Sequence, residues 1–339
     1  MKTYKVFAKR PTFIADNNRS YYQNPALTVK AYDNETKAFT EMYKKYRQGV
    51  KTVETKDSFE KKIGSLKKGS VSVRPFPIAK PNKVEVTNIL KEEAVASFHG
   101  KNPSTQDIDK YVKSLYDKVL NDRVYKWNEL QAYFNQLDQT RQDKEKASLE
   151  QDFQLRRQNM LDILHGEPYV IEKGMEELSK TIEVPFDFDF NYNYNHSTGL
   201  IEVEAETIND VPVPLQKAVL LASGRASIKN KLVREVKQDT KDTILSFVYL
   251  FVSKIFEISL NISKVQLTLW CADKTSGYCW IEIPREGIMR DRPKYLVPAF
   301  DYISYKRVID IRDKATGSEL YPIPITKFKK QIKEEKNNQ

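Results

Sequence analysis

The chain has 339 residues, of which 30% are charged and 40% hydrophobic, with only 11 glycines. This composition is typical of a soluble globular protein and excludes collagen-like and largely disordered chains, and the length favours about two or three folding units. The longest apolar run without charge, residues 243–253, is shorter than the roughly 18 to 20 residues that a membrane-spanning helix needs. The N-terminal sequence has no apolar core of a secretory signal, so we expect a cytoplasmic protein without a membrane partner.

Metal and cofactor chemistry has few candidate ligands. Two cysteines and three histidines are too few for an all-cysteine zinc site, and a mixed site would require distant loops to converge. We expect Cys271 and Cys279, which flank a predicted turn, to be reduced and structural. Walker, dinucleotide-binding and nucleophile-elbow motifs are absent from the sequence. We therefore expect no metal and no cofactor.

The net charge of +10 is unevenly distributed. Residues 1–100 hold 20 Lys and Arg against 10 Asp and Glu, whereas residues 166–225 hold 4 against 11. This polarity favours either a polyanionic partner or self-association between acidic and basic parts, and leaves both open.

The first predicted unit is a basic N-terminal region, residues 1–100. Residues 3–8 and 26–31 have the pattern of short strands, and residues 35–47 that of an amphipathic helix. The three prolines and the glycine in residues 65–83 predict a strand followed by an extended linker, and a unit boundary close to it.

Basic and aromatic side chains alternate within residues 1–60, which is what nucleic-acid binding requires. The candidate nucleic-acid-binding residues are Arg19, Tyr21, Tyr22, Lys44, Lys45 and Arg47. The alternative is a solvated basic helix face on which Tyr43 and Tyr46 only pack.

Residues 104–165 form the second predicted unit, and they are helical. Ser104 and Asp107 form a helix-capping signature, and no Gly or Pro follows until Gly166. Apolar residues recur at steps of three and four, but residues 138–148 are almost wholly polar. Either one helix of about 60 residues crosses solvent, or the chain folds back. We favour a helical hairpin or coiled-coil segment, because a polar stretch without a partner gains little from packing. This segment is the predicted contact with a protein partner, and an oligomer is compatible with it.

Acids and amides occupy every second position of residues 187–206 and alternate with aromatic and aliphatic side chains. A calcium loop counted from Asp187 would need Gly where Tyr192 stands and Glu where Thr198 stands. The alternation instead predicts two antiparallel strands joined by a turn at residues 195–199, with Phe186, Phe188 and Phe190 on the buried face.

The remainder of the third predicted unit, residues 166–325, contains a buried helix at about 240–260 and a strand at 264–270. Gly277 is free to take a positive φ in the turn before the next strand, YCWIEIP, so we predict a hairpin here. The lysine-rich residues 326–339 are predicted to be a solvated basic tail.

A metal-dependent nuclease is an alternative function. Its acids would activate water on a bound Mg²⁺, and the sequence offers Glu-x-Lys at Glu235 and Lys237, with Glu206 and Asp210 upstream. Several such matches are expected by chance in a chain this rich in both residue types. No sequence motif indicates catalysis, so we expect a protein that is not an enzyme.

Residues 187–325 resemble a domain that precedes Mrr-like restriction nuclease domains in some bacterial proteins. The shared outline is the NYNYNHSTGLIEVEAE hairpin, a proline-containing link, a long apolar helix, the strand-turn-strand VQLTLWCADKTSGYCWIEI and the late LYPIPI. The resemblance implies a role in a bacterial DNA-directed or defence assembly. The printed sequence ends where the nuclease domain would begin, so no catalytic residue is carried over.

The sequence therefore predicts an α+β protein with a basic N-terminal region, a long helical hairpin, and C-terminal antiparallel hairpins packed on a buried helix. We expect a non-enzymatic interaction protein that contacts nucleic acid. The alternatives are a nuclease with a degenerate site and a scaffold protein.

Overall fold

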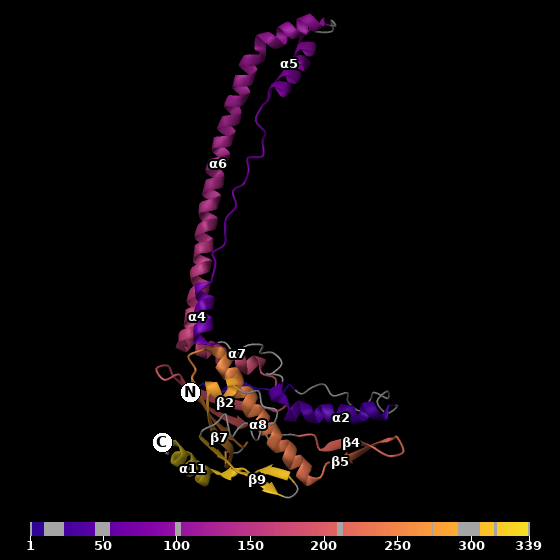
Figure 1. Ribbon diagram of the computed structural model, residues 1–339, viewed down its shortest axis with the longest axis vertical. Helices are drawn as coiled ribbons and strands as arrows, with labels where there is room; N and C mark the ends of the chain where they lie inside the picture. The colour runs from indigo at the N-terminus through magenta and orange to yellow at the C-terminus, as the bar shows by residue number, and fades with distance from the viewer. Residues whose placement is uncertain are drawn as a thin grey trace. The chain divides into compact units, whose positions relative to one another are not determined.

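The computed structural model describes residues 2–9, 24–44, 55–98, 103–208, 213–272, 274–290, 306–314 and 317–337. The chain divides into two compact units (Figure 1). Unit 1 comprises Met1–Gly64 and Asn159–Gln339, and unit 2 comprises Ser65–Gln158. Helices and strands both contribute, so the predicted α+β class is confirmed.

Unit 1 is built on a mixed sheet. Its strands are β1 (Tyr4–Val6), β2 (Phe188–Asn195), β3 (Leu200–Thr207), β6 (Lys264–Trp270), β7 (Ser276–Pro284), β8 (Lys306–Ile309) and β11 (Ile323–Pro324). The order is β1-β2-β3-β6-β7-β11, and β8 also pairs with β7. All pairs are antiparallel except β3 with β6. A parallel pair requires a crossover connection, and here the crossover contains helix α8 (Val233–Ile258).

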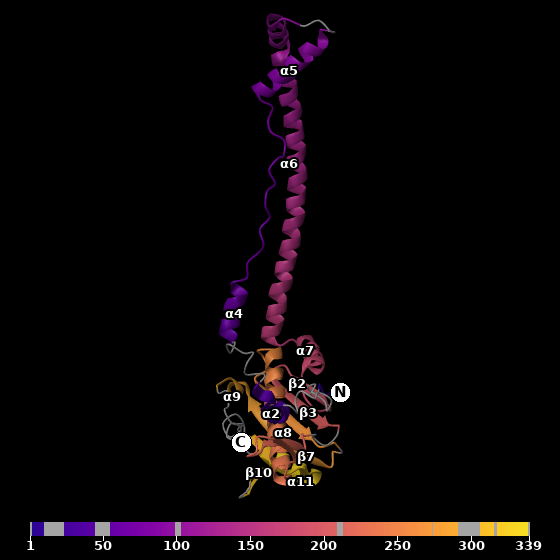
Figure 2. The same cartoon turned by 90° about the vertical axis from the view of Figure 1, so that its right-hand side faces the viewer.

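Helix α8 forms the centre of the core on one face of the sheet. Every side chain of the apolar run 243–253 is buried, and the ring of Phe247 lies 4.8 Å from that of Phe188 and 5.3 Å from that of Phe251. Helices α7 (Pro168–Thr181) and α2 (Pro25–Thr40) also contact α8 (Figure 2). The predicted buried helix is confirmed, although it begins earlier, in the polar residues 233–242.

The β2–β3 hairpin has the predicted turn and faces. Phe190 pairs with Ala205 on the buried face, while Asp189 pairs with Glu206 on the other. Gly199 closes the turn with a φ of +64°, and a Cβ there would lie 2.1 Å from the Asn261 carbonyl oxygen. Only glycine fits this position without strain.

The opposite face of the sheet is partly covered by helix α11 (Ile325–Asn337). Phe328 is fully buried against Trp270, with ring centroids 5.2 Å apart. The predicted solvated tail is therefore wrong, because one phenylalanine docks this basic segment as a helix. The predicted hairpin of residues 264–284 is confirmed as β6–β7, but Gly277 does not use its freedom to take a positive φ. A Cβ at this position would lie 2.1 Å from the Phe328 ring.

Smaller elements surround this core. They are hairpins β4–β5 (Gln216–Leu220 and Ala226–Asn230) and β9–β10 (Ile311–Lys314 and Gly317–Leu320), and helices α4 (Lys56–Gly64) and α9 (Arg285–Arg290). The strand predicted at 26–31 is wrong, because these residues lie in α2, where Asn24 caps the N-terminus and Pro25 starts the helix. The strand predicted at 3–8 is present as β1.

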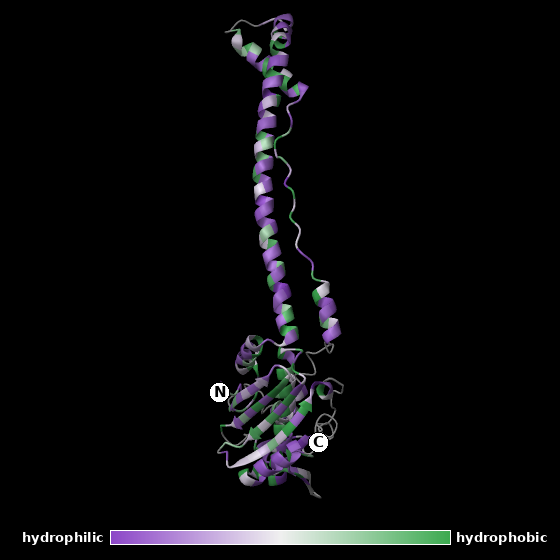
Figure 3. Cartoon of the chain, turned by 90° about the vertical axis from the view of Figure 1, so that its left-hand side faces the viewer, coloured by the Kyte–Doolittle hydropathy of each residue, from purple (hydrophilic) through white to green (hydrophobic). Residues whose placement is uncertain are grey.

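Unit 2 contains helix α5 (Lys83–Ser97) and most of helix α6 (Thr105–His165), which runs without a break for 61 residues. The helical hairpin predicted within 104–165 is therefore wrong. The polar stretch of α6 has a partner that the sequence did not reveal, namely residues 65–82, which form no helix or strand and which we call the strap. Figure 3 colours α6 as mostly hydrophilic with scattered hydrophobic positions, in contrast to the alternating strands of unit 1.

The strap is held along α6 by bonds to its backbone. The Trp127 indole N–H donates to the Ile78 carbonyl oxygen at 2.9 Å, and the Arg141 guanidinium donates to that of Ser72 at 2.7 Å. In return, the Arg74 backbone N–H donates to the Asp138 carboxylate at 3.3 Å. Because an extended segment cannot satisfy its own backbone groups, the polar side chains of α6 stabilise it.

Candidate functional site

The residues proposed for a nuclease do not form one site. Glu206 lies on β3 and forms an ion pair with Lys274 at 2.7 Å. Glu235 lies in the first turn of α8, and Lys237 pairs with Glu319 on β10 at 3.1 Å. Asp210 lies outside the described residues. Each of the three described residues is thus held by a different partner.

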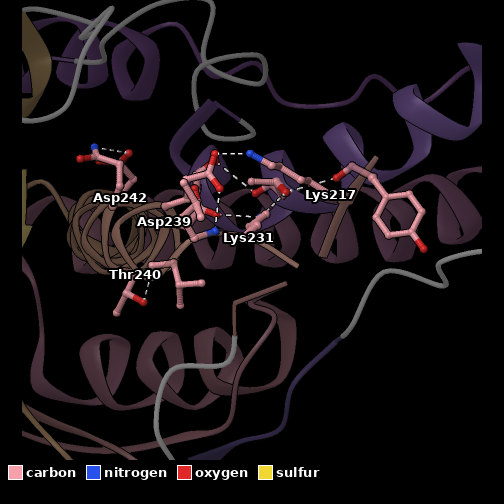
Figure 4. A network of polar contacts seen from close by, with 12 residues as sticks. Lys217, Lys231, Asp239, Thr240 and Asp242 are labelled. Carbon is pink, nitrogen blue, oxygen red and sulfur yellow. Dashed lines mark hydrogen bonds and ion pairs between the residues drawn. The ribbon is translucent and has the colours of Figure 1, made fainter. Parts of the chain in front are cut away.

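Glu235 instead belongs to a polar network at the N-terminal half of α8 (Figure 4). Its carboxylate accepts hydrogen bonds from the Lys217 ammonium on β4 and, at 2.8 Å, from the Leu232 backbone N–H. Lys231 Nζ lies 2.7 Å from Asp239 Oδ2 and donates to the Thr36 hydroxyl of α2 at 2.8 Å. A cavity of about 350 Å³ lies among these groups.

On its other side, the same half of α8 contacts the β9–β10 hairpin. Lys241 is buried, lies 3.5 Å from the Asp242 carboxylate and donates to the Ser318 hydroxyl. The Lys237 ammonium also lies over the Tyr321 ring, 5.7 Å from its centroid. The N-terminal half of α8, residues 233–242, therefore contacts the β4–β5 hairpin on one side and the β9–β10 hairpin on the other. The apolar C-terminal half of the helix packs on the sheet instead.

The ionisation of Glu235 suits a structural role better than a role as a catalytic base. The hydrogen bonds from Lys217 and Leu232 lower the pKa of Glu235, so this carboxylate stays ionised and is a weak base. Burial raises the pKa of Asp242, against the opposing effects of Gln238 and Lys241. Burial also raises the pKa of Glu35 on α2, with Lys231 opposing it.

A cavity of about 790 Å³ lies between α7, the C-terminal half of α8 and the end of α6 in unit 1. Its walls include Leu178, Leu250 and Ile258, and its charged residues are lysines and glutamates. Among the residues that the structure describes, no group of three or more His, Cys, Asp or Glu side chains could hold a metal ion.

Most of the predicted nucleic-acid-binding residues, Arg19, Tyr21, Tyr22, Lys45 and Arg47, lie outside the described residues. Lys44 forms an ion pair with Glu41 at 2.6 Å. Tyr43 is buried, with its ring 6.0 Å from that of Tyr249, so for this tyrosine the packing interpretation is confirmed. The strap is a second basic segment, and it was not among the predicted binding residues. Residues 65–84 contain five Lys and Arg and no Asp or Glu, and this composition could have identified it.

Comparison with known proteins gives no relative, since no family model, curated protein or solved structure matches the chain. In the described part of the chain, no helix is long and apolar enough to cross a membrane.

Proposed function

We propose that the protein is a non-enzymatic interaction protein and that unit 2 contacts its protein partner. The supporting observation is an exposed apolar surface on α6, which we call the α6 stripe: Leu130, Tyr133 and Leu137, at steps of three and four residues. Their exposed fractions are 51%, 61% and 52%. Apolar residues at this spacing anchor a helix to a partner.

The neighbouring surfaces of α6 are already used within unit 2. Phe76 of the strap packs on Trp127 and Phe134, with ring centroids 5.7 and 5.3 Å apart. The buried face of α5 (Val86, Leu90 and Ala94) lies in the same unit, in which α6 is the other described helix. Since its three side chains are about half or more exposed, the α6 stripe is available to another molecule. Self-association, the scaffold alternative, is one form of the same proposal.

The test replaces Leu130 and Leu137 with Asp in the full chain. We expect a concentration-dependent oligomer or a co-purifying protein to be lost, with an unchanged far-ultraviolet circular dichroism spectrum, because both side chains are exposed. Val95→Asp is the matched control, since Val95 is 55% exposed on α5 of the same unit, outside the stripe. A protein that is monomeric and purifies alone, with or without these changes, contradicts the proposal. Leu115 and Val119 are less suitable targets, since they are half-buried.

Nucleic acid is a second candidate partner, and the strap favours it. Its basic residues are exposed, and the Lys80 ammonium lies 5.8 Å from the Trp127 ring centroid. Binding through phosphates should weaken steeply with added salt and decrease in a Lys67→Glu, Lys80→Glu variant. Salt-independent or absent binding contradicts it. The cytoplasmic location, the bacterial origin and the DNA-directed or defence assembly belong to this proposal and rest on the sequence alone.

A further inference from the structure

The β4–β5 hairpin and its flanks, residues 213–234, have an unusual composition. They contain five Lys and Arg, no Asp or Glu, and no aromatic residue. They also carry many of the exposed large apolar side chains of unit 1, namely Leu215, Val219, Leu220, Leu221, Ile228, Leu232 and Val233. A short segment with this many exposed apolar side chains points to a contact with a protein or a membrane.

The tip of the hairpin is apolar on both faces. Leu220 is 56% exposed and Leu221 is 42% exposed, and neighbours at a strand end point to opposite sides. A hairpin that only packs on its own unit would bury one of the two. The turn is tight, with the Leu221 N–H bonded to the Arg225 carbonyl at 2.8 Å and Gly224 at a φ of +76°.

The base of the hairpin is anchored while its outer cations remain available. Lys217 and Lys231 are bound to Glu235 and Asp239 of α8, as described above. Lys229 lies directly opposite Lys217 in the strand register, which places two like charges side by side. Glu235 forms an ion pair with Lys217 but not with Lys229. Lys229 and Arg225 are exposed, and neither forms an ion pair within the described residues.

We propose that the β4–β5 hairpin binds an anionic lipid surface, with Leu220 and Leu221 at the boundary between headgroups and acyl chains and with Arg225 and Lys229 on lipid phosphates. Aliphatic side chains backed by cations are the combination that peripheral membrane segments use. A nucleic acid is disfavoured as the occupant because the hairpin has no aromatic ring on which a base could stack. The proposed contact is peripheral and involves no membrane-spanning segment.

Vesicle flotation with the full chain tests the proposal. We expect binding to vesicles of phosphatidylcholine with phosphatidylglycerol and little binding to phosphatidylcholine alone. Replacing Leu220 and Leu221 with Ser should reduce the binding constant about tenfold or more, and Arg225→Glu with Lys229→Glu should abolish the preference for anionic lipid. Leu155→Ser, a change at a comparably exposed leucine of unit 2, should bind like the wild type.

A site-specific probe shows whether the tip itself enters the lipid. Leu221→Cys can be labelled with a polarity-sensitive dye, because Cys271 and Cys279 are buried and burial raises the pKa of the Cys279 thiol to about 12. Emission should shift to the blue with anionic vesicles for Leu221→Cys but not for Leu155→Cys. Absence of vesicle binding, equal binding by the Leu220 and Leu221 variant, or no shift at Leu221→Cys overturns the proposal. A loss of duplex DNA binding in the same variants without any vesicle binding would assign the hairpin to nucleic acid instead.

Discussion

The two units hold their long helices by opposite means. Helix α8 of unit 1 is surrounded by apolar groups, so that residues 243–253 are all buried. In the unit 2 part of α6 the one side chain classed as buried, among the described residues, is a carboxylate, that of Asp138, which is 7% exposed. It accepts hydrogen bonds from Gln142 at 2.7 Å and from Arg141 at 2.8 Å, in addition to the strap N–H. A helix can thus be fixed by burying its own apolar face or by satisfying the backbone of a segment laid along it.

The largest effect is expected in the core of unit 1. Phe247→Ala removes a fully buried ring that contacts Phe186, Phe188 and Phe251. We expect it to lower the free energy of unfolding by about 3 to 5 kcal/mol, as cavities at buried aromatic residues do. Chemical denaturation followed by circular dichroism measures this, and Leu130→Ala, at an exposed position, should change it by less than about 0.5 kcal/mol. A loss below about 1 kcal/mol for Phe247→Ala would show that α8 is not the centre of the core.

A smaller and local effect is expected for the strap. Trp127→Phe keeps a ring against Phe76 but removes the N–H that donates to the Ile78 carbonyl. The loss of one such bond costs about 1 kcal/mol, which should make the strap open about fivefold more often. Hydrogen exchange of residues 65–82 measures it. Unchanged exchange in the strap, or equally faster exchange in α8, would contradict the separation of the two units.

The smallest effect concerns pH and has opposite signs in the two units. Hydrogen bonds from Gln142 and Arg141 lower the pKa of Asp138, so its contribution to strap stability is fully present above the unfolded value of about 4 and is lost as the pH falls through the folded value. Burial raises the pKa of Asp242, so protonation favours the folded form of unit 1 at that residue. The protection of strap amides against exchange, corrected for the intrinsic pH dependence of exchange, should therefore decrease below about pH 4, and Asp138→Asn should remove this dependence. An identical pH profile in the Asp138→Asn protein would refute this assignment.

The elements that the sequence predicted well are those whose pattern depends on local periodicity. The β2–β3 hairpin follows from alternation over residues 187–206, since one buried face accounts for every second residue. The buried helix around 243–253 follows from its uninterrupted apolar run. The turn at residues 195–199 could also be predicted, because it is closed within a few residues of the chain.

Apart from residues 26–31, where the helix-starting signals of Asn24 and Pro25 are local, the main failures share one physical cause, which is a partner distant in sequence. The polar stretch of α6 suggested a fold-back because its partner, the strap, lies some 60 residues earlier. The C-terminal segment 326–337 looked like a solvated tail because one residue, Phe328, decides its docking, and its socket is Gly277. The nuclease candidates Glu206, Glu235 and Lys237 lie within about 30 residues of one another in the sequence. In the structure each forms an ion pair with a different residue, so they do not form one site.

The amino-acid sequence by itself determined the α+β class, the amphipathic hairpin, the apolar core helix and the charge asymmetry, because these depend on composition and on side-chain periods of two and 3.6 residues. Only the tertiary structure decided that α6 is one helix, that the polar half of α8 anchors two hairpins, and that the leucines of the β4–β5 tip stay uncovered. These features depend on which distant group pairs with a charge, bonds a backbone amide or covers an apolar face. The local sequence pattern does not identify that group.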